Sequence, residues 1–471
     1  MSRIKIITLK SQNLYSNYII KLFFLCSILF SQEIPNEFFD FKLKKIHFDI
    51  GVDWQNNTTF GPMRYTRKVD TNDSLGIKAR FGISILNNQK ILYGYGHFTF
   101  KQYYHGYLYP RIVDNPSQVK RYSGKPRDIT RGGFSSGETD LSGICYQNKW
   151  MIIQFGRGRQ SWGAGNDIQL AITEESNSYD YGMLDLDFNR LKVRYFHGYL
   201  ETDTLSVSRY ITGRGIEWNN NLNFLVSLCE IIIYSGENRF IDFSYFNPIS
   251  THLELELNNR QNKYGTDGGN GVWQFSLDYM LLNKIRLSLN YLLDEFILDK
   301  VQKEKGKSGS SAFSFRSVFT PINKNNILLS IYGSMIAIGT NTFKHEDGYN
   351  NFAHRNSPLG WIYGSDSKED KIGLNCLINK KMQNKLEIGI RKNGEKNLLN
   401  DLYNPYSTYH EESFPSGSFE TLRFISYEFY FWLKQNISIF GYWEYNNSDK
   451  FGSYHNSKIG IDIYYPINRN L

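Results

Sequence analysis

The chain has 471 residues and a formal net charge of +8, half of which comes from four basic residues in the N-terminal segment. The remaining charge is small and dispersed, and no Lys/Arg run is interleaved with aromatic residues, which argues against nucleic-acid binding. Aromatic residues make up 16% of the chain, yet only 41% is hydrophobic and the mean hydropathy is −0.46. This combination is expected when only half of each strand faces lipid.

The first 31 residues combine basic residues with a short apolar stretch, Leu22 to Phe30, and a small residue, Ser31. This is the pattern of a secretory signal peptide. The apolar stretch is too short to cross ~30 Å of hydrocarbon as a helix. We therefore expect a signal peptide over residues 1–31, export through the inner membrane, and a single domain over residues 32–471.

Alternation of apolar and polar residues dominates the chain after this leader. From Gly76 to Ile85, apolar residues occupy every odd position, whereas Lys, Arg, Ser or Gly occupies every even one. A strand of this kind has one apolar face and one wet face. The same alternation recurs with charged residues on the polar parity in Lys284–Tyr291, Lys385–Arg391 and Lys458–Ile463. Because Arg or Lys facing lipid at the midplane of a barrel costs about 2 to 4 kcal/mol, the charged parity should face inward.

Short asparagine turns and long polar stretches separate the predicted strands, a contrast typical of the two rims of an outer-membrane barrel. Counting strands from Lys45 to Tyr465 predicts an all-β fold: a single transmembrane antiparallel β-barrel of about 18 strands, with long loops on one rim. A soluble β-sandwich or propeller is the structural alternative, because alternation alone does not show what covers the apolar face. The expected long loops are Tyr104–Ser136, Asn258–Asn270, Lys300–Ser310, Thr340–Lys371 and Lys392–Phe419.

The glycine-rich segment Phe155–Leu170 is the densest unusual stretch. A phosphate-binding loop would need a helix opening at the glycines and a Lys-Ser/Thr ending, which this segment lacks. Arg157, Arg159 and Trp162 supply groups that suit a sugar, because an aromatic ring stacks on a pyranose face while Arg donors reach hydroxyls or carboxylates. The alternative is structural: a Trp in an interfacial girdle and lumen arginines paired with Glu230, Asp294 or Glu295 to hold the barrel closed.

Four motifs in this order resemble the capsule-assembly Wzi family of Gram-negative outer-membrane proteins. The resemblance extends over roughly Thr139 to Asp370. The first motif is an Arg-rich strand end leading into Trp-Gly-x-Gly, within Arg157–Leu170. The other three lie in Ser227–Glu230 with Tyr245–Pro248, in Leu293–Phe296, and in His354–Asp366.

The resemblance implies an outer-membrane barrel, about eighteen-stranded, that binds exported polysaccharide and organises it at the cell surface. In the characterised relative an N-terminal helical bundle accompanies the barrel, whereas this chain has a strand-like run at Phe39–Trp54 and ends at Leu471 rather than on an aromatic residue. The implied partners are capsular or other surface polysaccharide, outer-membrane lipid and the barrel-assembly machinery. The polysaccharide-binding candidates are Arg157, Arg159, Trp162, Asn166, Glu230, Asn247, Asp294, Arg355 and Asp366.

Two other functions stay open at this point. A general or anion-selective porin is suggested by Lys78, Arg80, Lys284 and Arg286 on the inward parity. A barrel enzyme would need a compact catalytic cluster, and the sequence has neither a Gly-x-Ser-x-Gly elbow nor a His-Glu-x-x-His motif. We therefore predict a non-enzymatic protein with no cofactor, metal or catalytic residue.

Overall fold

The computed structural model describes residues 75–119, 122–127, 132–165, 167–262, 269–282, 284–295, 301, 304, 309–324, 327–345, 348–379, 381–400, 413–434 and 436–470. The predicted signal peptide, the run Phe39–Trp54 and the candidate Asn166 lie outside these residues. Among the described residues, no helix is long and apolar enough to cross a membrane.

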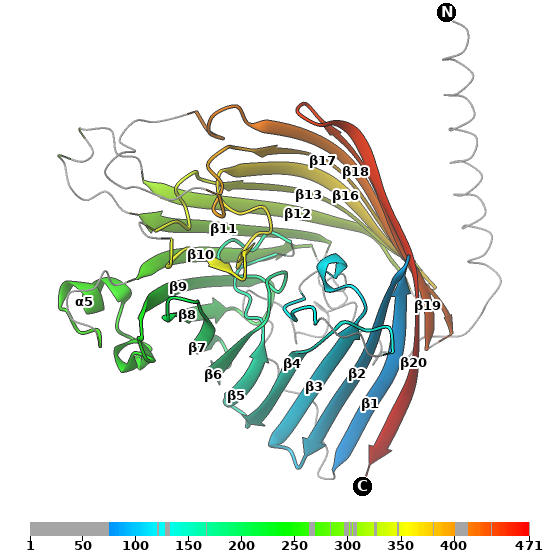
Figure 1. The fold of residues 1–471 in the computed structure, drawn as a ribbon, viewed down its shortest axis with the longest axis horizontal. Coiled ribbons are helices and arrows are strands. Elements are labelled where there is room, and N and C mark those ends of the chain that lie inside the picture. Colours follow the sequence, from blue (N-terminus) through cyan, green and yellow to red (C-terminus); the bar gives the residue numbers. More distant parts are fainter. Residues whose placement is uncertain are drawn as a thin grey trace, which may run out of the picture.

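The chain forms a closed antiparallel barrel of 18 strands (Figure 1). Each wall strand pairs with the next along the chain, β13 pairs with β16, and β1 pairs with both β2 and β20, which closes the ring. The predicted fold and strand number are therefore confirmed. The wall strands are β1 (Gly76–Leu86), β2 (Gln89–Phe100), β3 (Tyr104–Val113), β4 (Ser136–Gln147), β5 (Met151–Gly158), β6 (Tyr179–Phe188), β7 (Leu191–Thr202), β8 (Val207–Asn219), β9 (Phe224–Glu237), β10 (Asn270–Leu281), β11 (Ile285–Glu295), β12 (Ser310–Lys324), β13 (Ile327–Ile338), β16 (Ser367–Ile378), β17 (Met382–Asn393), β18 (Glu420–Lys434), β19 (Ile437–Ser448) and β20 (Gly452–Asn470).

The two rims differ as the sequence predicts. Every connection on one rim has at most four residues, whereas the other rim carries the long connections 114–135, 159–178, 238–269, 296–309, 339–366 and 394–419. The predicted loop Tyr104–Ser136 is wrong in its first half, because Tyr104–Val113 is strand β3. Tyrosines on both parities hide the alternation there. The connection 238–269 begins earlier than expected and contains η2 (Phe243–Phe246) and α5 (His252–Leu257).

The orientation of the wall follows the charge rule. Lys385, Glu387 and Arg391 point inward and form ion pairs among the strands, whereas Ile388 and Ile390 are exposed on the outside. Lys284, expected on the inward face, instead lies exposed in the turn before β11.

Two long loops fold into the bore and together form what we call the plug, residues 159–178 and 339–366 (Figure 1). The first leaves β5 and reaches β11, where Asn290 Oδ1 accepts from Ala164 N at 2.6 Å. It continues to β17, about halfway round the ring, where Lys385 Nζ lies 3.7 Å from Asp167 Oδ2. The positive φ angles of Gly163 (132°) and Gly165 (73°) explain two glycines of the glycine-rich segment.

The second plug loop packs on the first. Thr173 N donates to Leu359 O at 2.9 Å, and Trp361 N donates to Leu170 O at 3.2 Å. The loop also contains the short pair β14 (Ala353–His354) and β15 (Ser357–Pro358). The inward charged parity predicts a polar bore, but the bore is not polar throughout. Buried apolar side chains of the two plug loops, including Trp162, Phe352 and Leu359, form one cluster with inward-facing wall residues such as Ile231 and Ile233 of β9.

Candidate functional site

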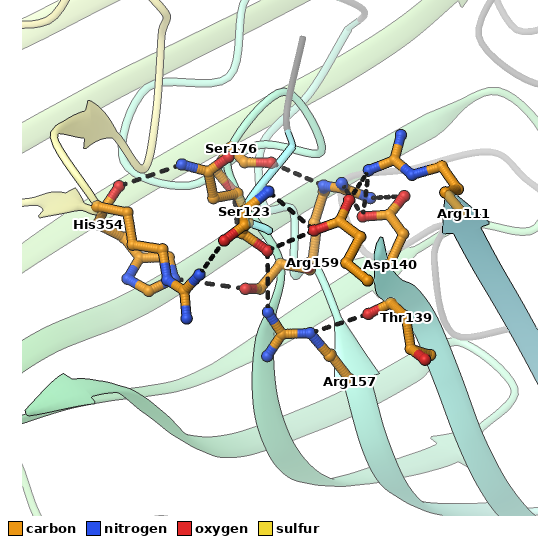
Figure 2. Close-up of polar contacts among 12 residues, drawn as sticks. Arg111, Ser123, Thr139, Asp140, Arg157, Arg159, Ser176 and His354 are labelled. Carbon is orange, nitrogen blue, oxygen red and sulfur yellow. Dashed lines mark hydrogen bonds and ion pairs between the residues drawn. The ribbon is translucent and has the colours of Figure 1, made fainter. Parts of the chain in front are cut away.

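Four arginines gather at the long-loop rim and form what we call the arginine cluster: Arg111, Arg157, Arg159 and Arg355. They come from β3, from β5, from the start of the first plug loop and from the second plug loop. Figure 2 shows Arg111 of β3 and Arg159 pointing toward Asp140 of β4, and Arg157 of β5 pointing toward Ser123 of the β3–β4 loop. The cluster therefore joins three loops that are far apart in the sequence.

Ser123 connects two of the arginines. Arg157 Nη2 donates to Ser123 Oγ at 3.2 Å, while Arg355 Nη1 donates to Ser123 O at 2.5 Å. Arg157 also donates from Nε to Thr139 O at 3.1 Å and lies 3.2 Å from the exposed carboxylate of Asp180. Arg355 is thus oriented by a neutral backbone oxygen, Arg157 by two neutral oxygens and an exposed carboxylate, and both face solvent in part.

Arg111 and Arg159 are held more firmly. Both contact Asp140 Oδ1, at 3.2 Å from Arg111 Nη2 and at 2.5 Å from Arg159 Nη2. Arg111 also pairs with Glu138, whose Oε2 accepts from Ser123 N at 2.8 Å. These inner pairs are buried and orient the outer arginines. Since Glu138 and Asp140 are both committed to arginines, they are poorly placed to act as a catalytic acid and base.

An aromatic ring lies beside the guanidinium groups. The guanidinium carbon of Arg111 lies 5.4 Å from the ring centroid of Tyr122, and the Tyr122 hydroxyl donates to Ser136 Oγ at 3.1 Å. Burial raises the pKa of Tyr122, so its phenol stays protonated near neutral pH. Together the groups offer arginine donors, one phenol and an aromatic face, which suit hydroxyl-rich and carboxylate-bearing ligands.

The other predicted candidates lie elsewhere. Trp162 is fully buried in the plug, with Arg194 5.5 Å from its ring, so it belongs neither to an interfacial girdle nor to the arginine cluster. Glu230 faces the outside of the barrel and accepts from Arg214 Nε at 2.8 Å. Asn247 accepts from the same arginine through its carbonyl at 2.7 Å.

Asp294 and Asp366 anchor the second plug loop. Asp294 accepts from Phe343 N. Asp366 is fully buried and accepts from Thr340 Oγ1 at 2.8 Å, from Ser416 N at 2.9 Å and from Lys396 N at 3.0 Å. The nine candidates thus do not converge: of the eight that are described, Arg157, Arg159 and Arg355 share one site, and the rest hold loops in place.

Sequence reasoning missed Arg111, Tyr122 and Asp140. The alternation of β3 would have placed Arg111 on the inward parity near the long-loop rim, had that segment been recognised as a strand. The structural alternative is confirmed in kind, because Arg157 and Arg159 do pair with acidic side chains. The expected partners Glu230 and Asp294 are wrong, because the acids that these arginines contact are Asp180 and Asp140. The side chain of the third expected partner, Glu295, lies outside the described residues.

Two of the residues suggested for an anion path make close contacts within the wall. Arg286 is buried and paired with Asp278, and Arg80 lies against the ring of Tyr464 at 5.2 Å. The side chain of Lys78 is outside the described residues. Within the described chain, no group of three or more His, Cys, Asp or Glu side chains is arranged to hold a metal ion.

Comparisons with known proteins place the fold. No protein-family model and no curated protein sequence matches the chain. Among solved structures, Wzi of Escherichia coli, reported as an outer-membrane protein involved in group 1 capsule assembly and as a carbohydrate-binding β-barrel, matches with a TM-score of 0.57 at 12% identity, covering 83% of this chain and 84% of Wzi.

Two further barrels are more distant. OprD of Pseudomonas aeruginosa has a TM-score of 0.42 at 9% identity, covering 88% of this chain and 98% of OprD. OccAB4 of Acinetobacter baumannii has a TM-score of 0.46 at 6% identity, covering 85% of this chain and 100% of OccAB4. The chain therefore shares the barrel fold of Wzi, the protein whose family its sequence motifs resemble.

Proposed function

We propose that this protein is an outer-membrane barrel that binds exported, capsular polysaccharide at the cell surface and retains it there without chemical turnover. The observation that carries the proposal is the arginine cluster, four guanidinium groups gathered at the long-loop rim beside loops that cross the bore. The plug supports attachment over general permeation, because a porin needs a continuous aqueous path.

The chemistry is that of a lectin-like surface. Arg157 and Arg355 offer donors to sugar hydroxyls or uronate carboxylates, whereas Arg111 and Arg159 set the orientation of the loops that present them. Each contact is weak, and repetition along a polymer multiplies the weak contacts into stable attachment. The shared fold with Wzi, a carbohydrate-binding barrel, supports the same assignment.

The location belongs to the proposal as well. The exposed apolar outer wall suits contact with outer-membrane lipid, and the long-loop rim, opposite the chain ends of β1 and β20, would face the cell exterior. Export through a signal peptide over residues 1–31 and insertion by the barrel-assembly machinery would complete this route.

Two measurements together test the function. Deletion of the gene should reduce the capsule retained on washed cells, and purified protein should bind the capsular polymer of the same strain in a surface-immobilised assay. Complementation with the intact gene is the control for the deletion. Intact capsule in the deletion strain together with no polymer binding would reject the proposal.

Conductance in planar bilayers separates attachment from the porin alternative. We expect the purified barrel to show only small conductance, since the plug spans from β5 to β17. A large open channel with anion preference would favour the porin instead.

A further inference from the structure

The β9–β10 connection folds over the outside of the barrel, and we call residues 238–262 the arm. In Figure 1, α5 extends beside β9 at the left edge of the wall. The wall residues beneath the arm have the same parity as Leu228 and Ile216, which are 49% and 52% exposed on the outer surface. The arm therefore covers outward-facing positions.

The contacts between arm and wall are polar and buried. Arg214 and Glu230 oppose each other on β8 and β9, and both bind arm backbone: Arg214 Nη1 donates to Asn247 O at 2.7 Å, and Glu230 Oε1 accepts from His252 N at 3.0 Å. Tyr210 OH also donates to Arg239 O at 2.8 Å. The arm thus shields a pair of outward-facing charges.

The height of this pair places it beside hydrocarbon. Trp218, Phe224 and Tyr279 form an outward aromatic group near the short-turn rim, with ring centroids 6.2 and 6.0 Å apart. Glu230 is six residues beyond Phe224 along β9, and Tyr234 is ten. At ~3.3 Å per residue and a strand tilt of ~40°, Glu230 and Tyr234 lie roughly 15 and 25 Å above the aromatic group. Both heights fall within the outward apolar band of a membrane barrel, which is ~25 Å tall.

The outer surface of the arm carries large apolar side chains: Phe240, Phe243, Ile249 and Leu257 are 82%, 81%, 86% and 72% exposed. The exposed charged side chains Glu254, Glu256 and Arg260 lie in α5 and just after it, at the C-terminal end of the arm. In contrast, Asp242, Tyr245 and His252 are buried toward the wall. Large apolar side chains outside, buried polar side chains inside and exposed charges confined to one end is an arrangement that suits a segment lying at the membrane interface.

We propose that the arm is embedded in the outer leaflet of the membrane, with its exposed phenylalanine and aliphatic side chains among lipid acyl chains. The inference rests on the proposed membrane location of the barrel. The arm then serves as a lateral anchor that fixes the depth of the barrel and keeps the Arg214–Glu230 pair from lipid.

A photoreactive lipid tests this on the unaltered protein. The purified barrel is reconstituted with phosphatidylcholine carrying a diazirine in one acyl chain, irradiated and mapped by mass spectrometry. We expect labelled peptides to include residues 240–257 as well as wall peptides containing Leu228. Label on the wall peptides with none on residues 240–257 would overturn the inference.

Spin labels provide a second test and a matched control. In a cysteine-free background, labels are attached at Phe243→Cys in the arm, at Ile216→Cys on the lipid-facing wall and at Leu205→Cys in the exposed β7–β8 turn. We expect the Phe243→Cys and Ile216→Cys labels to collide with oxygen and not with a water-soluble nickel complex, and the Leu205→Cys label to do the reverse.

The outcomes separate the two proposals. If the label at position 243 contacts water while the label at position 216 contacts lipid, the arm inference is overturned and the proposal of a membrane barrel is retained. A label at 243 shielded from both reagents also overturns it, since protein, such as a second copy of the chain, would then cover the arm. A label at 216 in water rejects the membrane location itself.

Discussion

Asn290 on β11 and Ala164 in the first plug loop bond to each other in both directions across the bore. Asn290 Oδ1 accepts from Ala164 N at 2.6 Å, and Asn290 Nδ2 donates to Ala164 O at 3.0 Å. Asn290 Nδ2 also contacts Ile168 O at 3.2 Å. One carboxamide therefore fixes a loop that starts on the other side of the barrel.

Asn290→Leu should release the first plug loop. The change leaves the buried backbone N–H and C=O of Ala164 without the side chain that pairs with both, at a cost of ~1–3 kcal/mol each, whereas Ile168 O keeps its hydrogen bond from Ser314 Oγ. We expect larger and noisier single-channel conductance in planar bilayers. Asn375→Leu is the matched control, because Asn375 is also buried and its Oδ1 makes no hydrogen bond. Equal conductance in the two variants would contradict this role of Asn290.

Asp366→Asn should loosen the second plug loop and the β17–β18 connection together. Asparagine tolerates the left-handed backbone of Asp366, whose φ is 57°, so the change acts through the side chain. Ser416 N and Lys396 N donate to different oxygens of Asp366, so the NH2 group of asparagine faces one of these two donors, at a cost of ~1–3 kcal/mol. We expect faster hydrogen exchange at residues 339–366 and 394–400, with unchanged exchange in β1 and β2. Unchanged exchange in the loops would show that Asp366 is not an anchor.

Arg355→Gln should weaken polysaccharide binding. Loss of one charge-assisted hydrogen bond is worth ~1.5–3 kcal/mol, which corresponds to roughly 10- to 100-fold in affinity. Lys450→Gln is the control, since it removes one charge from the β19–β20 connection on the same rim. Polymer affinity measured at several salt concentrations should fall only for Arg355→Gln. Equal affinities in both variants would move the binding site away from the arginine cluster.

Acidification should weaken the β14–β15 segment. Burial lowers the pKa of His354, and the nearby carboxylate of Glu201 only partly opposes the shift. As the pH falls, the unfolded segment therefore binds a proton before the folded one does. The contribution of neutral His354 to the stability of the segment is fully present above the ordinary pKa of ~6.5 and is lost as the pH falls toward the lowered pKa. Hydrogen exchange at residues 348–359, corrected for intrinsic rates, should be faster at acidic than at neutral pH. His354→Gln should remove this difference; a difference that persists would assign it to another group.

Glu230→Gln should destabilise the whole barrel. The change leaves Arg214 buried and without its counter-charge, and breaking a buried pair in this way costs ~3–5 kcal/mol. We expect a lower midpoint of urea unfolding in detergent micelles. The double variant Arg214→Leu/Glu230→Leu should recover much of the loss, because no charge is then left beneath the arm. A double variant as unstable as the single one would show that packing, not charge, explains the effect.

Local sequence determined the barrel. Period-two alternation, an inward charged parity and the contrast between asparagine turns and long polar stretches are set by neighbouring residues, because lipid and water impose opposite demands on the two faces of a strand. The eighteen strands and the inward orientation of Lys385, Glu387 and Arg391 follow from these local demands.

The positions of the loops were decided only by the tertiary structure. Glu230 shares the parity of Leu228, which is exposed on the outer surface, so its charge contradicts the alternation unless a distant segment covers it, as Asn247 and His252 of the arm do. Likewise, nothing near Trp162 in the sequence shows that its ring lies beside Arg194 of β7 and that its carbonyl accepts from Gln274 of β10. These contacts join residues that are far apart along the chain, so only closure of the ring, which fixes which rim positions face each other, determines them.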